Sequence, residues 1–155
     1  TGRHQTRIVQ LLAGRLPAEQ FVDVFQPDWR TLNLVWTRFR EMGQPEDWPV
    51  LVTHAHRAAE REVPNVSFSV ASGIWLHLSV MYRDINHSAG ELAALEAAHR
   101  NYPSSYTVRS RLGNLLAQQG RHDEAEPHLR WCLARRPQAQ NVRTALRNTT
   151  QGLLR

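Results

Sequence analysis

The internal organisation of this chain is clearest in two consecutive segments: residues 72–105, SGIWLHLSVMYRDINHSAGELAALEAAHRNYPSS, and residues 106–139, YTVRSRLGNLLAQQGRHDEAEPHLRWCLARRPQA. They are identical at three positions, which are Leu78/Leu112, Leu95/Leu129 and Pro103/Pro137. These are positions at which two packed helices need either a large apolar group or a stop. The chain therefore has an internal period of 34 residues.

The first half of each segment has the apolar spacing of an amphipathic helix, with Trp75, Leu78 and Tyr82 at i, i+3 and i+7. Ser79 and its equivalent Gly113 are small, which allows a second helix to approach closely. The apolar residues of that second helix are Leu92, Leu95 and Ala98 in one segment and Ala125, Leu129, Cys132 and Leu133 in the other. Each segment is thus expected to fold as an antiparallel helical hairpin, with Trp75, Leu78, Tyr82, Leu95, Leu112, Leu116 and Leu129 buried.

Turn and capping signals separate the expected helices of the second segment. Gly120 is suited to a positive φ after the first helix, and Asp123-x-x-Glu126 has the spacing of a cap for the next one. Pro127 is expected in the first turn of that helix or just beyond it, where a missing N–H costs least. Pro137 follows the second helix and stops it.

These residues resemble the tetratricopeptide repeat family, whose pattern of Trp, Leu, Gly, Tyr, Ala, an aromatic residue and Pro also extends over 34 residues. The resemblance covers residues 72–139 and implies two repeats in an all-α, right-handed superhelix of antiparallel helix pairs. The chain departs from the pattern at Ser79, where Gly is usual, at Glu91, where a small Ala is expected, and at Arg109, where a bulky residue is expected. The first two departures predict a locally rearranged turn at residues 84–89.

The flanking segments are also expected to be helical. Residues 140–155 predict a C-terminal capping helix, with Val142, Leu146 and Leu153 at helical spacing. Residues 1–65 fit the 34-residue template poorly and predict degenerate helical hairpins that pack on the repeat array. Their expected helices are Arg3–Ala13, Ala18–Phe25, Trp29–Met42 and Trp48–Glu62. Residues 65–69 would be a linker, or alternatively a short strand.

Composition narrows the functional classes. Apolar residues make up 41% of the 155 residues, which suffices for a continuous core. Cys132 is the single cysteine, which excludes an internal disulfide or a cysteine-based zinc cluster, and its apolar neighbours predict burial. No apolar run approaches the roughly 20 residues of a membrane span, and the opening residues do not resemble a signal peptide. We expect a soluble piece of a larger protein, because the chain begins at Thr1, and its cellular side stays open between cytoplasmic and periplasmic.

Catalytic motifs are weak. The densest cluster of ligand types is His54-x-His56-x-x-x-Glu60, but on a helix the two histidines project about 200° apart and only His56 and Glu60 share a face. The sequence has no Gly-rich phosphate loop, nucleophile elbow or paired-carboxylate motif. We therefore expect no enzymatic activity, cofactor or metal.

The family resemblance instead implies a protein or peptide partner, bound on a concave face that the first helix of each pair lines. The non-core residues of those helices are the expected ligand-binding set: His77, Arg83, Thr107, Ser110, Arg111, Asn114, Gln118, Thr144 and Asn148. Asn114 is the best single candidate, because its amide both donates and accepts hydrogen bonds. Arg111 would attract an acidic ligand. Leu76 and Val80 stand where one variant of the family clamps a carboxylate with Lys and Asn, so that specificity is not expected.

Charge supports an alternative partner. Residues 106–155 hold nine arginines against three acidic residues, and the whole chain has no lysine. Nucleic acid is the rival partner, with phosphates neutralised by Arg109, Arg111, Arg130, Arg135, Arg136, Arg143 and Arg147. A third reading is a structural module that packs on its parent chain or self-associates.

Overall fold

The computed structural model describes residues 11–154, and this part of the chain is all-α. Its helices are α2 (Ala18–Phe25), α3 (Trp29–Met42), α4 (Asp47–Glu62), the 3₁₀ helix η1 (Val63–Asn65), α5 (Phe68–Asp84), α6 (Ser88–Asn101), α7 (Tyr106–Gln118), α8 (His122–Arg135) and α9 (Gln140–Leu153). The all-α expectation is confirmed for these residues, and the alternative of a strand at residues 65–69 is wrong. None of the described helices is both long and apolar enough to cross a membrane.

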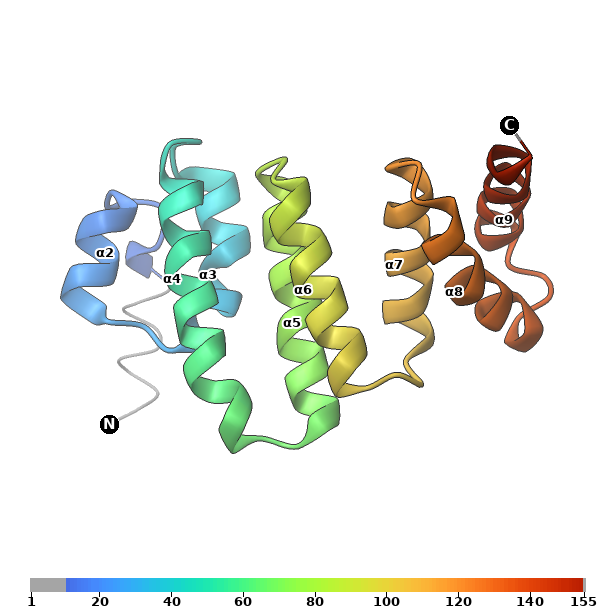
Figure 1. Ribbon diagram of the computed structural model, residues 1–155. Helices are drawn as coiled ribbons and strands as arrows, with labels where there is room; N and C mark the ends of the chain where they lie inside the picture. Colours follow the sequence, from blue (N-terminus) through green and yellow to red (C-terminus); the bar gives the residue numbers. More distant parts are fainter. Residues whose placement is uncertain (1–10, 155) are drawn as a thin grey trace.

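Successive groups of helices follow one another across the molecule, with α2 and α9 at opposite ends and α4 between α2 and α3 (Figure 1). The closest packing is within successive pairs, α5 on α6 and α7 on α8, and α9 packs on α8. The pairs are joined through contacts of α4 with α5, of α6 with α7 and of α7 with α9. The described chain is therefore a row of helices in which each element contacts mainly its neighbours in sequence.

The N-terminal helices begin and end where sequence signals place them. The bounds of α2 and α3 are as predicted, and α4 starts one residue earlier than predicted, at Asp47. Asp28 caps α3 by accepting a hydrogen bond from the Thr31 backbone N–H at 2.8 Å, and hydrogen bonding to Thr31 lowers the pKa of this carboxyl. Most of the expected first helix, Arg3–Ala13, lies outside the described residues.

The start of α2 is capped by a contact that local patterns do not encode. The Ala18 backbone N–H donates a hydrogen bond to Asp47 Oδ1 at 2.7 Å. One carboxylate at the first residue of α4 therefore satisfies an otherwise unpaired donor at the first residue of α2. The two helix starts are thereby held together.

The 34-residue offset also relates the helix bounds. A shift of 34 residues takes the first residue of α6 to the first of α8, and the first residue of α7 to the first of α9. The same shift takes the last residue of α5 to the last residue of α7. The helix α5 begins earlier than the offset predicts, at Phe68 instead of Ser72, which adds one turn before the repeating part. Phe68 and Val70 in this added turn are exposed.

The turns between the helices of the two hairpins have the same geometry, so the predicted rearrangement of residues 84–89 is wrong. Asn86 takes φ 56° and its equivalent Gly120 takes φ 75°. In both turns the following backbone N–H donates back to the helix, His87 to Tyr82 O at 2.9 Å and Arg121 to Leu116 O at 3.0 Å. Asn can take this left-handed conformation, so the turn does not need Gly.

Gly90 supplies the small group that Glu91 does not. A Cβ added at Gly90 would lie 2.4 Å from Cδ1 of Tyr82, so any larger residue would collide with that ring. Gly113 has the matching role in the next hairpin, because an added Cβ would lie 2.9 Å from Leu129 Cγ. The close helix approach predicted at Gly113 is confirmed.

The predicted cap of α8 by Asp123 and Glu126 is wrong. The helix begins at His122, after Arg121, and no side chain hydrogen-bonds its first backbone N–H groups. Arg121 instead forms a bidentate pair with Glu124, with N–O distances of 2.7 Å, and Glu126 pairs with Arg130 at 2.8 Å. The acidic residues thus lie inside the first two turns, where negative charge is favourable near a helix N-terminus.

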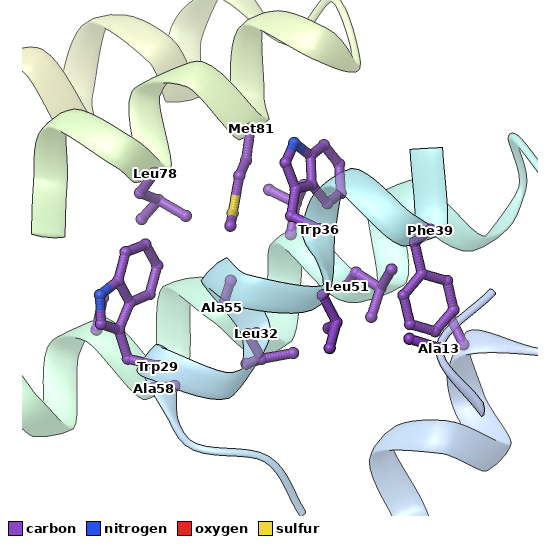
Figure 2. Close-up of a cluster of buried hydrophobic side chains, with 14 of the residues drawn as sticks. Ala13, Trp29, Leu32, Trp36, Phe39, Leu51, Ala55, Ala58, Leu78 and Met81 are labelled. Carbon is purple, nitrogen blue, oxygen red and sulfur yellow. The ribbon is translucent and has the colours of Figure 1, made fainter. Parts of the chain in front are cut away.

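Buried side chains form two clusters on either side of the α5–α6 pair. One cluster joins α2, α3 and α4 to α5, and Figure 2 shows Leu78 and Met81 of α5 pointing toward Trp29 and Trp36 of α3. The other contains Leu95, Leu112, Leu116, Ala125, Leu129, Cys132 and Val142. Both helices of the α5–α6 pair carry small buried residues, which are Ala71 and Ser72 on α5 and Ala94, Ala97 and Ala98 on α6. Two cores therefore meet at a closely packed helix pair.

Most residues expected in the core are buried. Leu78, Leu95, Leu112, Leu116 and Leu129 are at most 2% exposed, and Cys132 is fully buried, as predicted. Trp75 and Tyr82 are only half-buried, which corrects the prediction for these two rings. The Tyr82 hydroxyl lies 2.8 Å from Nδ1 of His56, so its polar end needs a partner that a fully apolar site would not provide.

Candidate binding surface

The nine residues predicted to bind a ligand lie on α5, α7 and α9. The 34-residue offset makes His77 equivalent to Arg111, Ser110 equivalent to Thr144, and Asn114 equivalent to Asn148. The helices α7 and α9 also pack against each other. The structure therefore brings predicted residues of α7 and α9 to corresponding positions on packed neighbours.

Six of the nine side chains are exposed: His77, Arg83, Thr107, Gln118, Thr144 and Asn148. Arg111 and Asn114 are half-buried. Ser110 is only 8% exposed, so the expectation that it offers an accessible hydroxyl is wrong. The difference from its equivalent Thr144 has a simple cause: α7 is covered by α6, α8 and α9, whereas no described helix follows α9.

Asn114 is partly committed within its own helix. Its Nδ2 donates a hydrogen bond to the Ser110 carbonyl at 2.6 Å. This bond uses one donor of the amide and leaves the side-chain oxygen and a second N–H for a ligand. Asn114 thus stays a candidate, with its amide orientation fixed by the helix.

Glu91 lies beside the predicted surface and was not among the predicted residues. Burial raises the pKa of its carboxyl, the charges of Arg83 and Arg111 oppose that increase, and Asp84 adds to it. The two arginines of the predicted set therefore act on one carboxylate that α6 places between α5 and α7. An acidic ligand would have to compete with Glu91 for them. The sequence signal was present, since Glu91 stands where the family has a small residue.

Asp84 ties the end of α5 to α3. Its Oδ2 accepts a hydrogen bond from Trp36 Nε1 at 3.1 Å and another from the Arg40 guanidinium. Arg83 Nη2 lies 3.8 Å from Asp84 Oδ1. Part of the charge of Arg83 is thus balanced within the protein.

The histidine motif of α4 has a packing role. His56 Nε2 lies 3.4 Å from Glu60 Oε1, as expected for two residues on one helix face. The His56 ring also contacts Trp75 and Tyr82 edge-on, with centroids 5.5 and 5.9 Å away. Within residues 11–154 no group of three or more His, Cys, Asp or Glu side chains is arranged to hold a metal ion.

Several C-terminal arginines stack on aromatic rings, which the sequence reasoning missed. The guanidinium carbons of Arg109 and Arg135 lie 4.6 and 3.5 Å from the ring centroid of Trp131. The guanidinium carbon of Arg136 lies 4.2 Å from the ring centroid of Tyr106. The i, i+4 spacing of Trp131 and Arg135 was a usable signal, but the other two contacts join residues far apart in sequence.

Comparison of the sequence with models of known protein families found no match, and comparison with curated proteins found none either. The resemblance to tetratricopeptide repeats therefore rests on the residues and register of this chain.

Proposed function

We propose that this chain is a non-enzymatic, tetratricopeptide-like interaction module whose helices form a right-handed superhelix. Its partner is a protein or peptide, bound along the face made by α5, α7 and α9. The observation that carries the proposal is the shared register of these helices, which gives Asn114 and Asn148 equivalent positions on packed neighbours.

The register suits an extended peptide. Packed helices lie about 8–10 Å apart, and an extended chain rises about 3.3 Å per residue, so equivalent side chains on α7 and α9 match about every third residue of a peptide. An extended peptide has unpaired N–H and C=O groups, and the Asn amide can bond to either. The exposed Thr107, Gln118 and Thr144 add further polar groups along the row.

The test is selection of ligands from a random peptide library, followed by affinity measurements with an Arg111→Ala, Asn114→Ala double variant. Enrichment of a common motif, and binding weakened about tenfold or more in the double variant, would support the proposal. Failure to enrich any motif, or equal affinity for both proteins, would count against it.

Arg61→Ala, Asn65→Ala is the matched control. The Asn65 amide donates to the Arg61 carbonyl at 2.9 Å, which is the same i, i−4 bond that Asn114 makes to Ser110. The control therefore removes the same two residue types and the same local bond from α4 and η1, outside the proposed face. Loss of binding in the control alone would place the binding surface on the N-terminal helices.

Nucleic acid is the second candidate partner, favoured by the excess of arginine in residues 106–155. Fluorescence anisotropy of labelled RNA and DNA of mixed sequence at low and physiological salt tests it. Tight binding with a steep salt slope would favour nucleic acid, because such binding releases counterions.

A third candidate is a structural module that packs on its parent chain or self-associates. Self-association predicts a molecular mass that rises with concentration in sedimentation, and packing on the parent chain predicts that no ligand is found.

A further inference from the structure

Three arginine side chains gather where α7 begins and α8 ends. Tyr106 is the first residue of α7, Arg135 is the last residue of α8, and Arg136 follows it. The two ends are side by side, since Cys132 Sγ lies 3.8 Å from the Tyr106 carbonyl oxygen and the Arg136 guanidinium lies over the Tyr106 ring. Arg109 and Arg135 share the ring of Trp131. We call Arg109, Arg135 and Arg136 the arginine cluster.

The cluster is held in place by its own contacts. Arg109 Nε donates to the Pro103 carbonyl at 2.6 Å while its guanidinium lies over Trp131. A guanidinium that stacks on a ring uses its flat face and keeps its N–H edge available for an in-plane, bidentate contact. Stacking itself uses no hydrogen-bond donor, although Arg135 Nη1 also donates to the Trp131 carbonyl at 3.4 Å. The remaining N–H groups of these side chains stay available for a ligand, and less side-chain entropy is lost when it binds.

The arginine cluster concentrates positive charge at one place. In the part of the chain that the structure describes, none of the three arginines forms an ion pair with Asp or Glu. Arg135 and Arg136 are exposed, and Arg109 is half-buried. All three act on one buried group: each lowers the pKa of the Cys132 thiol, against the larger effect of burial, which raises it. Three like charges thus converge on one small region.

We propose that the arginine cluster is a docking surface for an acidic protein segment, a run of Asp and Glu side chains that it binds through bidentate guanidinium–carboxylate pairs. A short acidic segment fits a compact cluster of fixed forks better than nucleic acid does. A nucleic acid would require a basic track along the row, and the aromatic rings on which its bases could stack are already covered by guanidinium groups. The cluster shares α7 with the proposed α5–α7–α9 face but contains none of the nine residues predicted for that face.

Binding of a labelled peptide made of Asp and Glu, followed by fluorescence anisotropy, tests the proposal. An Arg135→Gln, Arg136→Gln variant should bind about tenfold or more weakly. The control Arg30→Gln, Arg57→Gln removes the same charge from exposed positions on α3 and α4 and should change affinity less than about twofold. Equal weakening in both double variants would overturn the proposal, because net charge alone would then explain binding.

Two further comparisons separate the alternatives. Arg135→Lys, Arg136→Lys keeps the charge but loses the planar fork, so undiminished binding by this variant would overturn bidentate recognition. A labelled single-stranded oligonucleotide that binds more tightly than the acidic peptide, and loses affinity in the Gln variant, would show nucleic acid to be the partner and overturn the proposal. Arg111→Ala, Asn114→Ala should leave acidic-peptide binding unchanged, so failure of either proposed surface can be recognised without the other.

Discussion

The imidazole rings of His99 and His128 meet edge to face, with centroids 4.9 Å apart and planes at 83°. His99 lies on α6 and His128 on α8, so the contact joins two successive hairpins. The Nδ1 atom of each ring is buried without a hydrogen-bond partner among the described residues. Burial and the charge of Arg109 lower the pKa of both rings. Together with the neighbouring His99, they lower that of His128 to about 4.

This pair predicts a loss of stability on acidification. The folded pKa of His128 is below that of an unfolded histidine, about 6.5, so the unfolded state binds more protons and the free energy of unfolding falls as pH falls. The loss begins near the unfolded pKa and is complete once pH passes below about 4. Because His128 is only partly buried, we expect it to amount to about 2 kcal/mol instead of the full value of the shift. Urea unfolding across this pH range measures it.

Carboxylates also titrate near the lower end of that range, so the informative quantity is a difference between proteins. His128→Gln should flatten the pH dependence relative to wild type, because the group that binds the extra proton on unfolding is gone. His54→Gln, which leaves the His99–His128 contact intact, serves as the control. The same pH slope in wild type and His128→Gln would refute the interpretation.

Sequence patterns predicted local features of this fold well and contacts between helices poorly. The bounds of α2 and α3, the positive φ of Gly120 and the close approach at Gly113 all follow from spacing and residue type. The bond between Asp84 and Trp36 joins residues 48 positions apart, and no periodicity encodes such a pairing.

The same limit applies to the candidate surface. The register predicted which helices carry the nine residues, but the burial of Ser110 depends on which helices flank α7, and the stacking of Arg109 depends on where α8 places Trp131. Both are consequences of packing. The wrong cap of α8 has a different origin: the Asp123-x-x-Glu126 spacing is present, but Arg121 pairs with Glu124 and the helix starts one residue before Asp123.

Substitution by alanine should have opposite effects on stability at Gly73 of α5 and Gly113 of α7, the first helices of the two hairpins. An added Cβ at Gly73 meets no atom within 4 Å, so Gly73→Ala should stabilise the protein by about 0.5–1 kcal/mol through helix propensity. An added Cβ at Gly113 would lie 2.9 Å from Leu129 Cγ, so Gly113→Ala should destabilise it by about 1–3 kcal/mol through overpacking. Chemical unfolding of both variants measures the difference, and a stabilising Gly113→Ala would show that the two helices can separate at little cost.

Asp84 should contribute more to stability than an ordinary surface carboxylate. Its side chain is only 13% exposed and accepts bonds from Trp36 and Arg40. Asp84→Ala leaves the partly buried indole N–H without this acceptor, which should cost about 1–3 kcal/mol. Asp23→Ala, at an exposed position on α2, is the control and should change the free energy of unfolding by less than about 0.5 kcal/mol. Equal effects would show that water replaces Asp84 at the Trp36 indole without loss.

Added salt should change the melting temperature little. In the pairs Arg30–Glu62, Arg121–Glu124 and Arg130–Glu126 at least one side chain is more than half exposed, and such pairs contribute about 0–1 kcal/mol each. The expected shift between low and moderate salt is at most a few degrees by calorimetry. A large decrease would mean that ion pairing holds the helices together more strongly than their apolar contacts do.

Leu112 and Leu78 occupy the same position in the 34-residue register but lie in different buried clusters, at 2% and 0% exposure. Truncation to alanine should cost about 2–5 kcal/mol at each site, because neighbouring side chains fill the resulting cavity only in part. Leu34→Ala is the control, since that side chain is 51% exposed and its loss should cost much less. Thermal unfolding of Leu112→Ala without loss of stability would contradict the register.

The unfolding transitions of Leu78→Ala and Leu112→Ala should also show whether the two buried clusters unfold together. Each element contacts mainly its neighbours in the row, so stability is the sum of unit and interface terms. The two clusters meet through the buried small residues of α5 and α6, where Ser72 Oγ donates to the Ala98 carbonyl at 2.8 Å. If this interface couples the clusters, Leu78→Ala and Leu112→Ala should each lower one common transition, seen identically by circular dichroism and by tryptophan fluorescence. Two separate transitions in Leu112→Ala, with the N-terminal cluster unfolding at its original temperature, would show that the α5–α6 interface does not transmit stability between them.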